Sequence, residues 1–227
     1  AGLTRSGILG ASTAPANSFA LLRGAAGLRG SQPGCVLVCT KTTASQSLAE
    51  ELGPVFEAAS PMPPLVLCQN GWGNAEIFAA RLPRDRIFNA RIITGFRRHA
   101  ANAVEVTVHA DAIRMGSLFG ADPACLAPLC VAISRGGIPC EISHEIGQDL
   151  WAKMLYNVLL NPLGALTRAP YGALGERAET RAILHELAHE IFSVMQAAGF
   201  RSRWPSARAY LASFYAELLP ATARRRC

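Results

Sequence analysis

The sequence predicts an α/β domain built on a parallel sheet, followed by an all-α domain. Two apolar runs, residues 35–39 and 65–68, are typical of strands that are buried on both faces of such a sheet. A helical stretch separates them and a second helix follows, which together give a strand–helix–strand–turn–helix order. Helical patterns dominate the remainder of the chain, so we expect domains of residues 1–146 and 147–227.

The elements can be assigned in order along the chain. The first 34 residues, rich in Gly, Ala and Ser, are expected to form short strands and loops. After them we expect a strand at 35–39, a helix at 44–56 stopped near Gly53-Pro54, a strand at 65–68, a glycine-rich turn at 69–74, a helix at 75–81, strands at 87–96 and 103–115, a helix at 123–135 and a strand at 138–142. The second domain is expected to contain helices at 148–167, 176–198 and 206–219, with breaks at Tyr171-Gly172 and at 199–201.

The composition is that of an ordinary globular protein, since half of the 227 residues are hydrophobic and 17% are charged. A net charge of +6 favours anionic small molecules as ligands, although a solvated basic surface explains it equally well. Aromatic residues make up only 7%, which argues against a base-stacking nucleic-acid surface. The uncharged stretches are too short to span a bilayer, so we expect neither nucleic acid nor a membrane as partner.

The cysteines indicate a reducing compartment. There are seven, an odd number, and no CxxC pair occurs, which is typical neither of a disulfide framework nor of a zinc site. From the residues of this chain we expect no secretory signal. We therefore expect reduced thiols in a cytoplasmic protein.

Lysine is rare in this chain, and its two occurrences mark candidate positions. Of 22 basic residues only Lys41 and Lys153 are lysines. Arginine stays charged, whereas lysine can lose its proton in a pocket and act as an acid or base. Lysine retained in such an arginine-rich sequence therefore indicates positions where arginine does not serve.

The strongest candidate site lies in the first helix of the second domain. Lys153, Asn157 and Asn161 stand four residues apart, which places an amine and two carboxamides in one stripe of the helix. A solvated stripe would normally carry Glu, Arg or Lys, and Asn is a poor helix former. The stripe therefore indicates a site facing a cleft, with a water-facing surface as the alternative. A separate apolar face is formed by Trp151, Met154, Leu155, Val158 and Leu159.

A second candidate follows the strand at 65–68. The run Gln69-Asn70-Gly71-Trp72-Gly73-Asn74 combines polar side chains with glycines that let a ligand approach the backbone closely. Ligands of open α/β sheets bind at the carboxyl ends of the strands. Lys41 stands at that end of the neighbouring strand, so both are expected to line one crevice. An ordinary tight turn uses the same residue types.

A third pattern suggests a metal. His185-Glu186-Leu187-Ala188-His189 matches the HExxH motif of zinc metalloproteases, whose two histidines share one helix face. A third ligand is required, and Glu217 is a distant candidate. Because the motif also suits the exposed face of an Ala-rich amphipathic helix, we expect no metal here.

Taken together, three blocks resemble the ketopantoate reductase family in order and spacing. They are Val36-Leu37-Val38-Cys39-Thr40-Lys41, then Gln69-Asn70-Gly71-Trp72-Gly73, then Leu150-Trp151-Ala152-Lys153-Met154-Leu155-Tyr156-Asn157 through Asn161-Pro162-Leu163. The stretch from Phe214 to Ala223 is also similar, so the resemblance runs over nearly the whole chain. The Lys-x3-Asn-x3-Asn-Pro-Leu block is the most specific of these.

The resemblance implies a partial Rossmann-type nucleotide-binding domain, an all-α domain and an active site between them. It implies NADPH-dependent reduction of 2-dehydropantoate (ketopantoate), or of a similar 2-keto acid, in pantothenate and coenzyme A biosynthesis. By the same resemblance Lys153 is the general acid, which protonates the alkoxide formed by hydride transfer. Assembly as a homodimer is left open. The resemblance assigns substrate contacts to Asn70, Asn157, Asn161 and Tyr171, and cofactor contacts to Lys41, Asn70 and Phe96.

The sequence also departs from the family pattern. The family opens with a βα unit whose GxGxxG motif cradles a pyrophosphate, and this chain has no such motif. The family also continues beyond the equivalent of Cys227, into a segment with a serine for the substrate and a glutamate for the cofactor. We therefore expect a chain truncated at both ends that binds NADPH weakly or not at all. Tyr171 stands where the family usually has Asn, which leaves room for a different 2-keto acid.

Two other interpretations stay open. The chain would be a non-catalytic remnant of this fold if it has lost its grip on the cofactor, and would then act as a binding or structural protein. In a different class of function, it would be a zinc hydrolase that uses His185 and His189.

Overall fold

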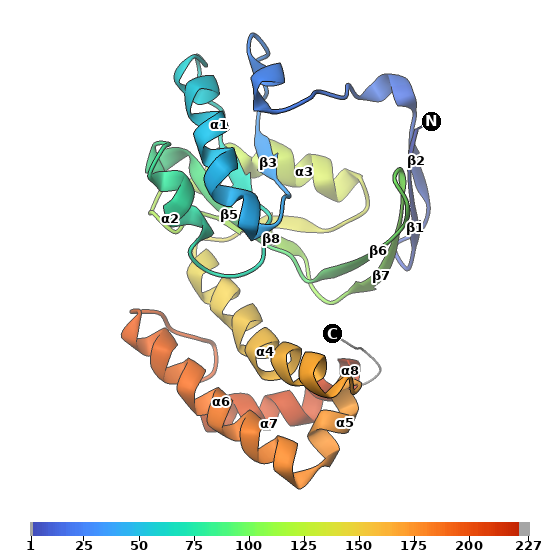
Figure 1. The fold of residues 1–227 in the computed structure, drawn as a ribbon, viewed down its shortest axis with the longest axis vertical. Helices are drawn as coiled ribbons and strands as arrows, with labels where there is room; N and C mark the ends of the chain where they lie inside the picture. The colour runs from blue at the N-terminus through green and yellow to red at the C-terminus, as the bar shows by residue number, and fades with distance from the viewer. Residues whose placement is uncertain (1, 223–227) are drawn as a thin grey trace. The chain divides into compact units, whose positions relative to one another are not determined.

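The computed structural model describes residues 2–222, and the chain divides into two compact units, Ala1–Ile146 and Gly147–Cys227 (Figure 1). The first unit contains two sheets with helices, and the second contains helices alone within its described residues. The predicted fold class, an α/β domain followed by a helical domain, is therefore confirmed. No helix within residues 2–222 is both long and apolar enough to cross a membrane.

A five-stranded sheet forms the centre of the first unit, in the order β3-β4-β5-β8-β9. The first three strands run parallel, β8 is antiparallel to β5, and β9 is parallel to β8. The carboxyl ends of β3 and β4 therefore lie at the same edge, as the sequence predicts. The strands are β3 (Val36–Val38), β4 (Leu65–Leu67), β5 (Ile87–Arg91), β8 (Ile113–Gly116) and β9 (Cys140–Ile142).

Helices cover both faces of this sheet (Figure 1). Alternate side chains of β4 point to opposite faces, so Leu65 and Leu67 enter one core while Val66 enters the other, and all three are buried. The first core includes residues of α1 (Ser45–Glu57) and α2 (Asn74–Ala79), and the second includes Cys130 of α3 (Ala127–Arg135). The prediction of a doubly buried strand at 65–68 is thus confirmed.

The other apolar run behaves differently. The strand expected at 35–39 is β3, an edge strand among the described residues, and Leu37 is 43% exposed on its outer face. The expectation of burial on both faces is therefore wrong for this strand. An apolar run in the sequence does not reveal whether other elements of the fold cover both faces of the strand.

Helix α1 also differs from the expectation. It continues through Pro54 to Glu57, instead of stopping near Gly53-Pro54. Val55 and Phe56, which are 8% and 1% exposed, belong to the core under this helix. Burial of these side chains outweighs the local cost of proline in the last turn.

A second sheet has four strands in the order β2-β1-β7-β6. Its strands are β1 (Leu3–Gly7), β2 (Ser12–Ala14), β6 (Thr94–Ala100) and β7 (Ala103–His109). The long strands predicted at 87–96 and 103–115 are therefore each divided between the two sheets. Arg91 is the last residue of β5 and Asp111 lies in the link between β7 and β8. Their side chains pair at 2.8 Å between Nη2 and Oδ2.

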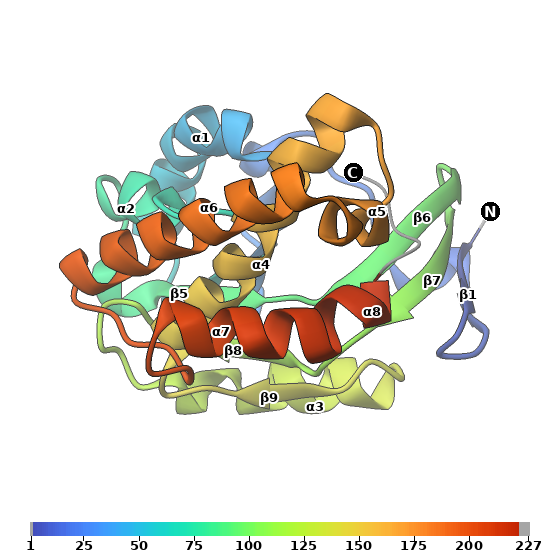
Figure 2. The same cartoon turned by 90° about the horizontal axis from the view of Figure 1, so that it is seen from below.

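The second unit is built from helices, and the first of them, α4 (Ile146–Thr167), starts one residue before the unit boundary. It is followed by α5 (Tyr171–Glu176), α6 (Ala178–Ala197), α7 (Ala207–Ser213) and α8 (Leu219–Thr222), and a π-helical turn joins the last two. Helix α6 packs against α5 and α7, and α6 and α7 are seen side by side in Figure 2. The break predicted at Tyr171-Gly172 is wrong, because Tyr171 is the first residue of α5.

Candidate functional site

The loops that follow β3 and β4 are joined by side-chain hydrogen bonds. Gln69, which is 8% exposed, donates through Nε2 to the carbonyl oxygen of Thr40 at 3.2 Å and to Oγ of Ser45 at 3.0 Å. Oγ1 of Thr42 donates to the carbonyl oxygen of Asn70 at 3.4 Å. Strand order predicts that the loops after β3 and β4 lie at the same end of the sheet. Hydrogen bonds link these two loops directly.

The turn after β4 depends on its glycines for backbone conformation. Gly71 and Gly73 have φ angles of +92° and +89°, in the left-handed region that other residues rarely adopt. A Cβ at either position would meet nothing within 4 Å, so close packing does not explain the glycines. Asn74 begins α2 and donates from Nδ2 to the carbonyl oxygen of Asn70 at 3.2 Å, which closes the turn.

Lys41 and Asn70 are both exposed at this edge. The bond from Thr42 to the backbone of Asn70 brings their loops together. The crevice that both residues are expected to line stays a prediction. Oε1 of Gln69 is buried and accepts no hydrogen bond from the described residues. Buried carbonyl oxygens are normally satisfied, so this atom suits a donor from a bound molecule or a water. From the sequence, Gln69 is part of the second candidate run but is assigned no substrate or cofactor contact, although the first polar residue after a fully buried strand is a usable signal.

Phe96 is placed elsewhere. It lies in β6 of the four-stranded sheet and is 51% exposed. Phe96 is not a partner in the hydrogen bonds described above between the loops after β3 and β4.

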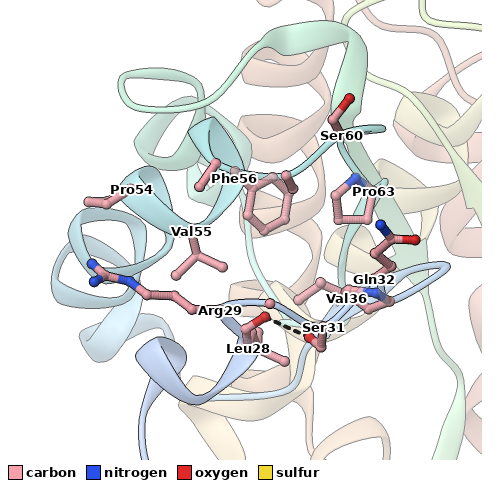
Figure 3. A pocket seen from close by; sticks show the side chains of 14 residues that line it. Leu28, Arg29, Ser31, Gln32, Val36, Pro54, Val55, Phe56, Ser60 and Pro63 are labelled. Carbon is pink, nitrogen blue, oxygen red and sulfur yellow. Dashed lines mark hydrogen bonds between the residues drawn. The ribbon is translucent and has the colours of Figure 1, made fainter.

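A cavity of about 440 Å³ lies at another part of this unit. Figure 3 shows the side chains that line it. Its walls include Leu28 and Arg29, Val36 at the start of β3, and Val55 and Phe56 from the last turn of α1. Because Lys41 follows the other end of β3, the cavity lies at the opposite edge of the sheet from the two joined loops. It is therefore not the crevice that the sequence predicts.

In the second unit, α4 carries the predicted polar stripe. All three of its residues are half-buried, namely Lys153, Asn157 and Asn161. Their side chains are neither in the core nor fully exposed to water. Trp151 is 3% exposed and packs near the ring of Phe200, with ring centroids 6.0 Å apart. The predicted apolar face is buried at Trp151, Leu155 and Leu159 but only half-buried at Met154 and Val158. The stripe is thus held beside a packed face.

Tyr171 joins this stripe. Its hydroxyl group donates to Oδ1 of Asn161 at 2.8 Å, across the turn between α4 and α5. Its side chain is 5% exposed and its ring meets that of Tyr156 edge-on, with centroids 6.3 Å apart. The structure therefore brings Tyr171 together with Asn161, and spacing along one helix did not reveal this contact.

The HExxH residues gain little support as a metal site. The ring of His185 packs against Tyr215, with centroids 5.8 Å apart, and Glu217 accepts a hydrogen bond from Ser213. Within residues 2–222 no group of three His, Cys, Asp or Glu side chains is arranged to hold a metal ion. The third ligand required by the zinc interpretation is therefore not found among them.

Both units match models of known families. Residues 12–119 match the family described as ketopantoate reductase PanE/ApbA, and residues 145–223 match the ketopantoate reductase PanE/ApbA C terminal. A 2-dehydropantoate 2-reductase of Aquifex aeolicus (strain VF5) is 30% identical over 192 residues, which cover 84% of this chain. The chain spans 61% of the length of that relative.

Solved structures show the same fold. A 2-dehydropantoate 2-reductase from Geobacter metallireducens GS-15 superposes with a TM-score of 0.82 at 21% identity, covering 99% of this chain and 71% of that one. A D-mandelate dehydrogenase solved with NADH and anilino(oxo)acetate gives a TM-score of 0.73 at 14% identity, covering 87% of this chain and 62% of that one. Taken with the two family matches, which cover most of the sequence, these findings establish that the chain belongs to the ketopantoate reductase family.

Proposed function

We propose that this protein is an oxidoreductase that uses NADPH to reduce 2-dehydropantoate, or a similar 2-keto acid, to the 2-hydroxy acid. The observation that carries the proposal is the half-buried stripe of Lys153, Asn157 and Asn161 on α4, inside the region matched to the family. The name of the Aquifex relative supports the same substrate. We assign nucleotide binding to residues 1–146 and substrate binding and catalysis to residues 147–227.

Lys153 is proposed as the general acid. NADPH, when bound, supplies the hydride that adds to the keto carbon of the substrate. The ammonium group of Lys153 stabilises the negative charge that grows on the substrate oxygen, and then gives its proton to that oxygen. Asn157 and Asn161 carry carboxamide groups that suit the substrate's carboxylate and hydroxyl groups.

The cofactor residues are proposed on the first unit. Lys41 and Asn70 are exposed where two parallel strands end, which is where nucleotides bind in open α/β sheets. A cation at Lys41 suits a phosphate, and the glycines of the turn leave open space beside the backbone. We also propose that the backbone of Phe96 contacts the cofactor, as the family resemblance implies. The bound NADH and oxo acid of the structurally similar D-mandelate dehydrogenase support a nicotinamide cofactor and a 2-keto acid.

The direct test is a steady-state assay on the full-length protein. We expect NADPH to be consumed with 2-dehydropantoate, and the 2-hydroxy acid to be recovered in one enantiomer. A panel of 2-keto acids with branched and aromatic substituents, each tested with NADPH and NADH, identifies the preferred pair. Protein that binds NADPH in a direct titration yet turns over no 2-keto acid would contradict the proposal and favour a binding function.

A further inference from the structure

Two cysteines stand opposite each other where β3 and β4 end. The register pairs Val38 with Leu67, so the next residues along the two strands, Cys39 and Cys68, are also opposite. The backbone N–H of Cys68 donates to the carbonyl oxygen of Val38 at 2.9 Å, so the strands are still paired at this point. Opposed residues of parallel strands point to the same face, and neighbouring strands lie about 4.8 Å apart, within the Cα separation that disulfides span.

The two thiols are in contact and differ in character. Cys68 is half-buried and shares a side-chain hydrogen bond with Cys39, which is exposed. That bond lowers the pKa of the Cys39 thiol from its ordinary 9.0 to about 7, against the opposing effect of burial. The same bond and burial raise the pKa of Cys68. Cys39 is therefore partly thiolate at neutral pH, and Cys68 is the thiol beside it.

The neighbouring cysteines lack this property. Burial raises the pKa of Cys35 to about 11 and that of Cys140 to about 12. Burial also raises the pKa of Cys125, although that side chain is exposed. Among these cysteines, Cys39 alone combines exposure with a lowered pKa, which is the combination that makes a thiol reactive.

We propose that Cys39 and Cys68 form a reversible intramolecular disulfide when the protein meets a small disulfide oxidant such as oxidised glutathione. The Cys39 thiolate attacks one sulfur of the oxidant, which gives a mixed disulfide and releases one glutathione thiolate. Cys68 then loses its proton to solvent and attacks the Cys39 sulfur, which releases the second glutathione. The protein loses two electrons and two protons, and one oxidised glutathione becomes two reduced molecules.

The position gives this disulfide a consequence. Thr40 and Gln69 immediately follow the two cysteines, and the side chain of Gln69 bonds to the backbone of Thr40 at 3.2 Å. A covalent bond one residue away pulls the starts of both loops together and changes the geometry of Lys41 and Asn70. If the proposed function is right, the affinity for NADPH changes on oxidation. The disulfide itself does not depend on that function.

The test is a peptide map of the full-length protein after treatment with oxidised glutathione, digested without reduction. Trypsin cleaves after Arg29 and Lys41, so Cys35 and Cys39 share one peptide while Cys68 lies on the next. We expect these two peptides to be joined, and dithiothreitol to separate them. The Cys35→Ser variant should still form the link, which assigns it to Cys39.

Two more variants complete the design. Cys68→Ser should accumulate glutathione on Cys39, because no second thiol resolves the mixed disulfide. Cys125→Ser removes an exposed thiol outside the pair and should leave the link intact. Wild-type protein that holds a stable glutathione adduct at Cys39, or that links Cys68 to another cysteine instead, would overturn the proposal. A titration of NADPH to oxidised and reduced protein separately measures the consequence for the cofactor.

Discussion

The hydroxyl group of Tyr171 donates a hydrogen bond of 2.8 Å to Oδ1 of Asn161. Because the carbonyl end of the carboxamide is taken up by this bond, the amide orientation is fixed and its NH₂ group is directed elsewhere. Tyr171 is almost fully buried, so packing around its ring holds the hydroxyl group in place. Tyr171 therefore positions Asn161 and is itself held away from solvent.

Replacing Tyr171 with Phe keeps the ring and removes this hydrogen bond. We expect a folded protein whose kcat/KM falls by roughly 2–10-fold, since a neutral hydrogen bond is worth about 0.5–1.5 kcal/mol. The loss should appear mainly in KM, because Asn161 is proposed to bind substrate. Tyr215→Phe, which deletes a hydroxyl elsewhere in the same unit, is the matched control. Identical kinetics for the two variants would show that Tyr171 does not orient Asn161.

Lys153→Arg should fold normally and lose most of its turnover. Arginine keeps the charge and is accepted almost everywhere else in this sequence, but its pKa is too high for it to donate a proton readily. Removing a general acid typically lowers the rate by about 10²–10⁴-fold. Steady-state kcat and KM with 2-dehydropantoate and NADPH measure the effect. An Arg variant within a few-fold of the wild type would exclude Lys153 as the proton donor.

Asp111→Asn should destabilise the first unit. Arg91 is 3% exposed and pairs with Asp111 at 2.8 Å, so the variant removes a carboxylate that a buried guanidinium contacts. Asp111 is itself partly exposed, so we expect a loss of about 1–2 kcal/mol in the free energy of unfolding. Chemical denaturation measures it. Glu141→Gln, which breaks an exposed pair with Arg114, is the control and should cost much less.

The same pair predicts a pH dependence. Burial acts to raise the pKa of Asp111, but the hydrogen bond and charge of Arg91 prevail and lower it below its ordinary 3.8. A lowered folded-state pKa gives stability that is present above the unfolded value and is lost as pH falls through the folded value. The stability difference between wild type and Asp111→Asn should therefore shrink below about pH 4. A difference that stays constant down to the acid transition would contradict this.

Alkylation of Cys39 should depend on pH near neutrality. Its pKa is lowered to about 7, chiefly by the hydrogen bond with Cys68, so its reaction with iodoacetamide should rise as pH passes through this value. Cys35, with a pKa of about 11, should react only at much higher pH. Cys68→Ala removes the hydrogen bond and should move the Cys39 profile to higher pH. Mass spectrometry of labelled peptides gives both profiles.

The purified protein should carry no stoichiometric zinc. The HExxH match places only His185 and His189 on one helix face, and the described residues around them supply no third ligand. Elemental analysis checks this. About one zinc per chain, lost in His185→Ala, would revive the hydrolase interpretation.

Local patterns in the sequence were enough for part of this structure. The stripe of Lys153 and Asn157 follows from helical spacing alone, and the joined loops after β3 and β4 follow from strand order. Contacts and exposure that depend on the tertiary fold could not be predicted from these local patterns. Leu37 and Val66 look alike in sequence, and only the sheet order makes one exposed and the other buried. The bond from Tyr171 to Asn161 likewise crosses a helix boundary that the pattern misplaced.

The parallel pairing of β1 with β7 has a consequence for how the chain assembles. Thr4 bonds to the carbonyl oxygen of Asn102, a partner 98 positions away in the sequence. By contrast, β6 and β7 adjoin in the chain and can form a hairpin from local contacts. During synthesis β1 and β2 emerge before β7, so the edge of β1 that pairs with β7 stays open until residues 103–109 have been made. The contact between β1 and β7 therefore closes after the local β6–β7 contacts, and until then the free edge of β1 is open to pairing with other chains.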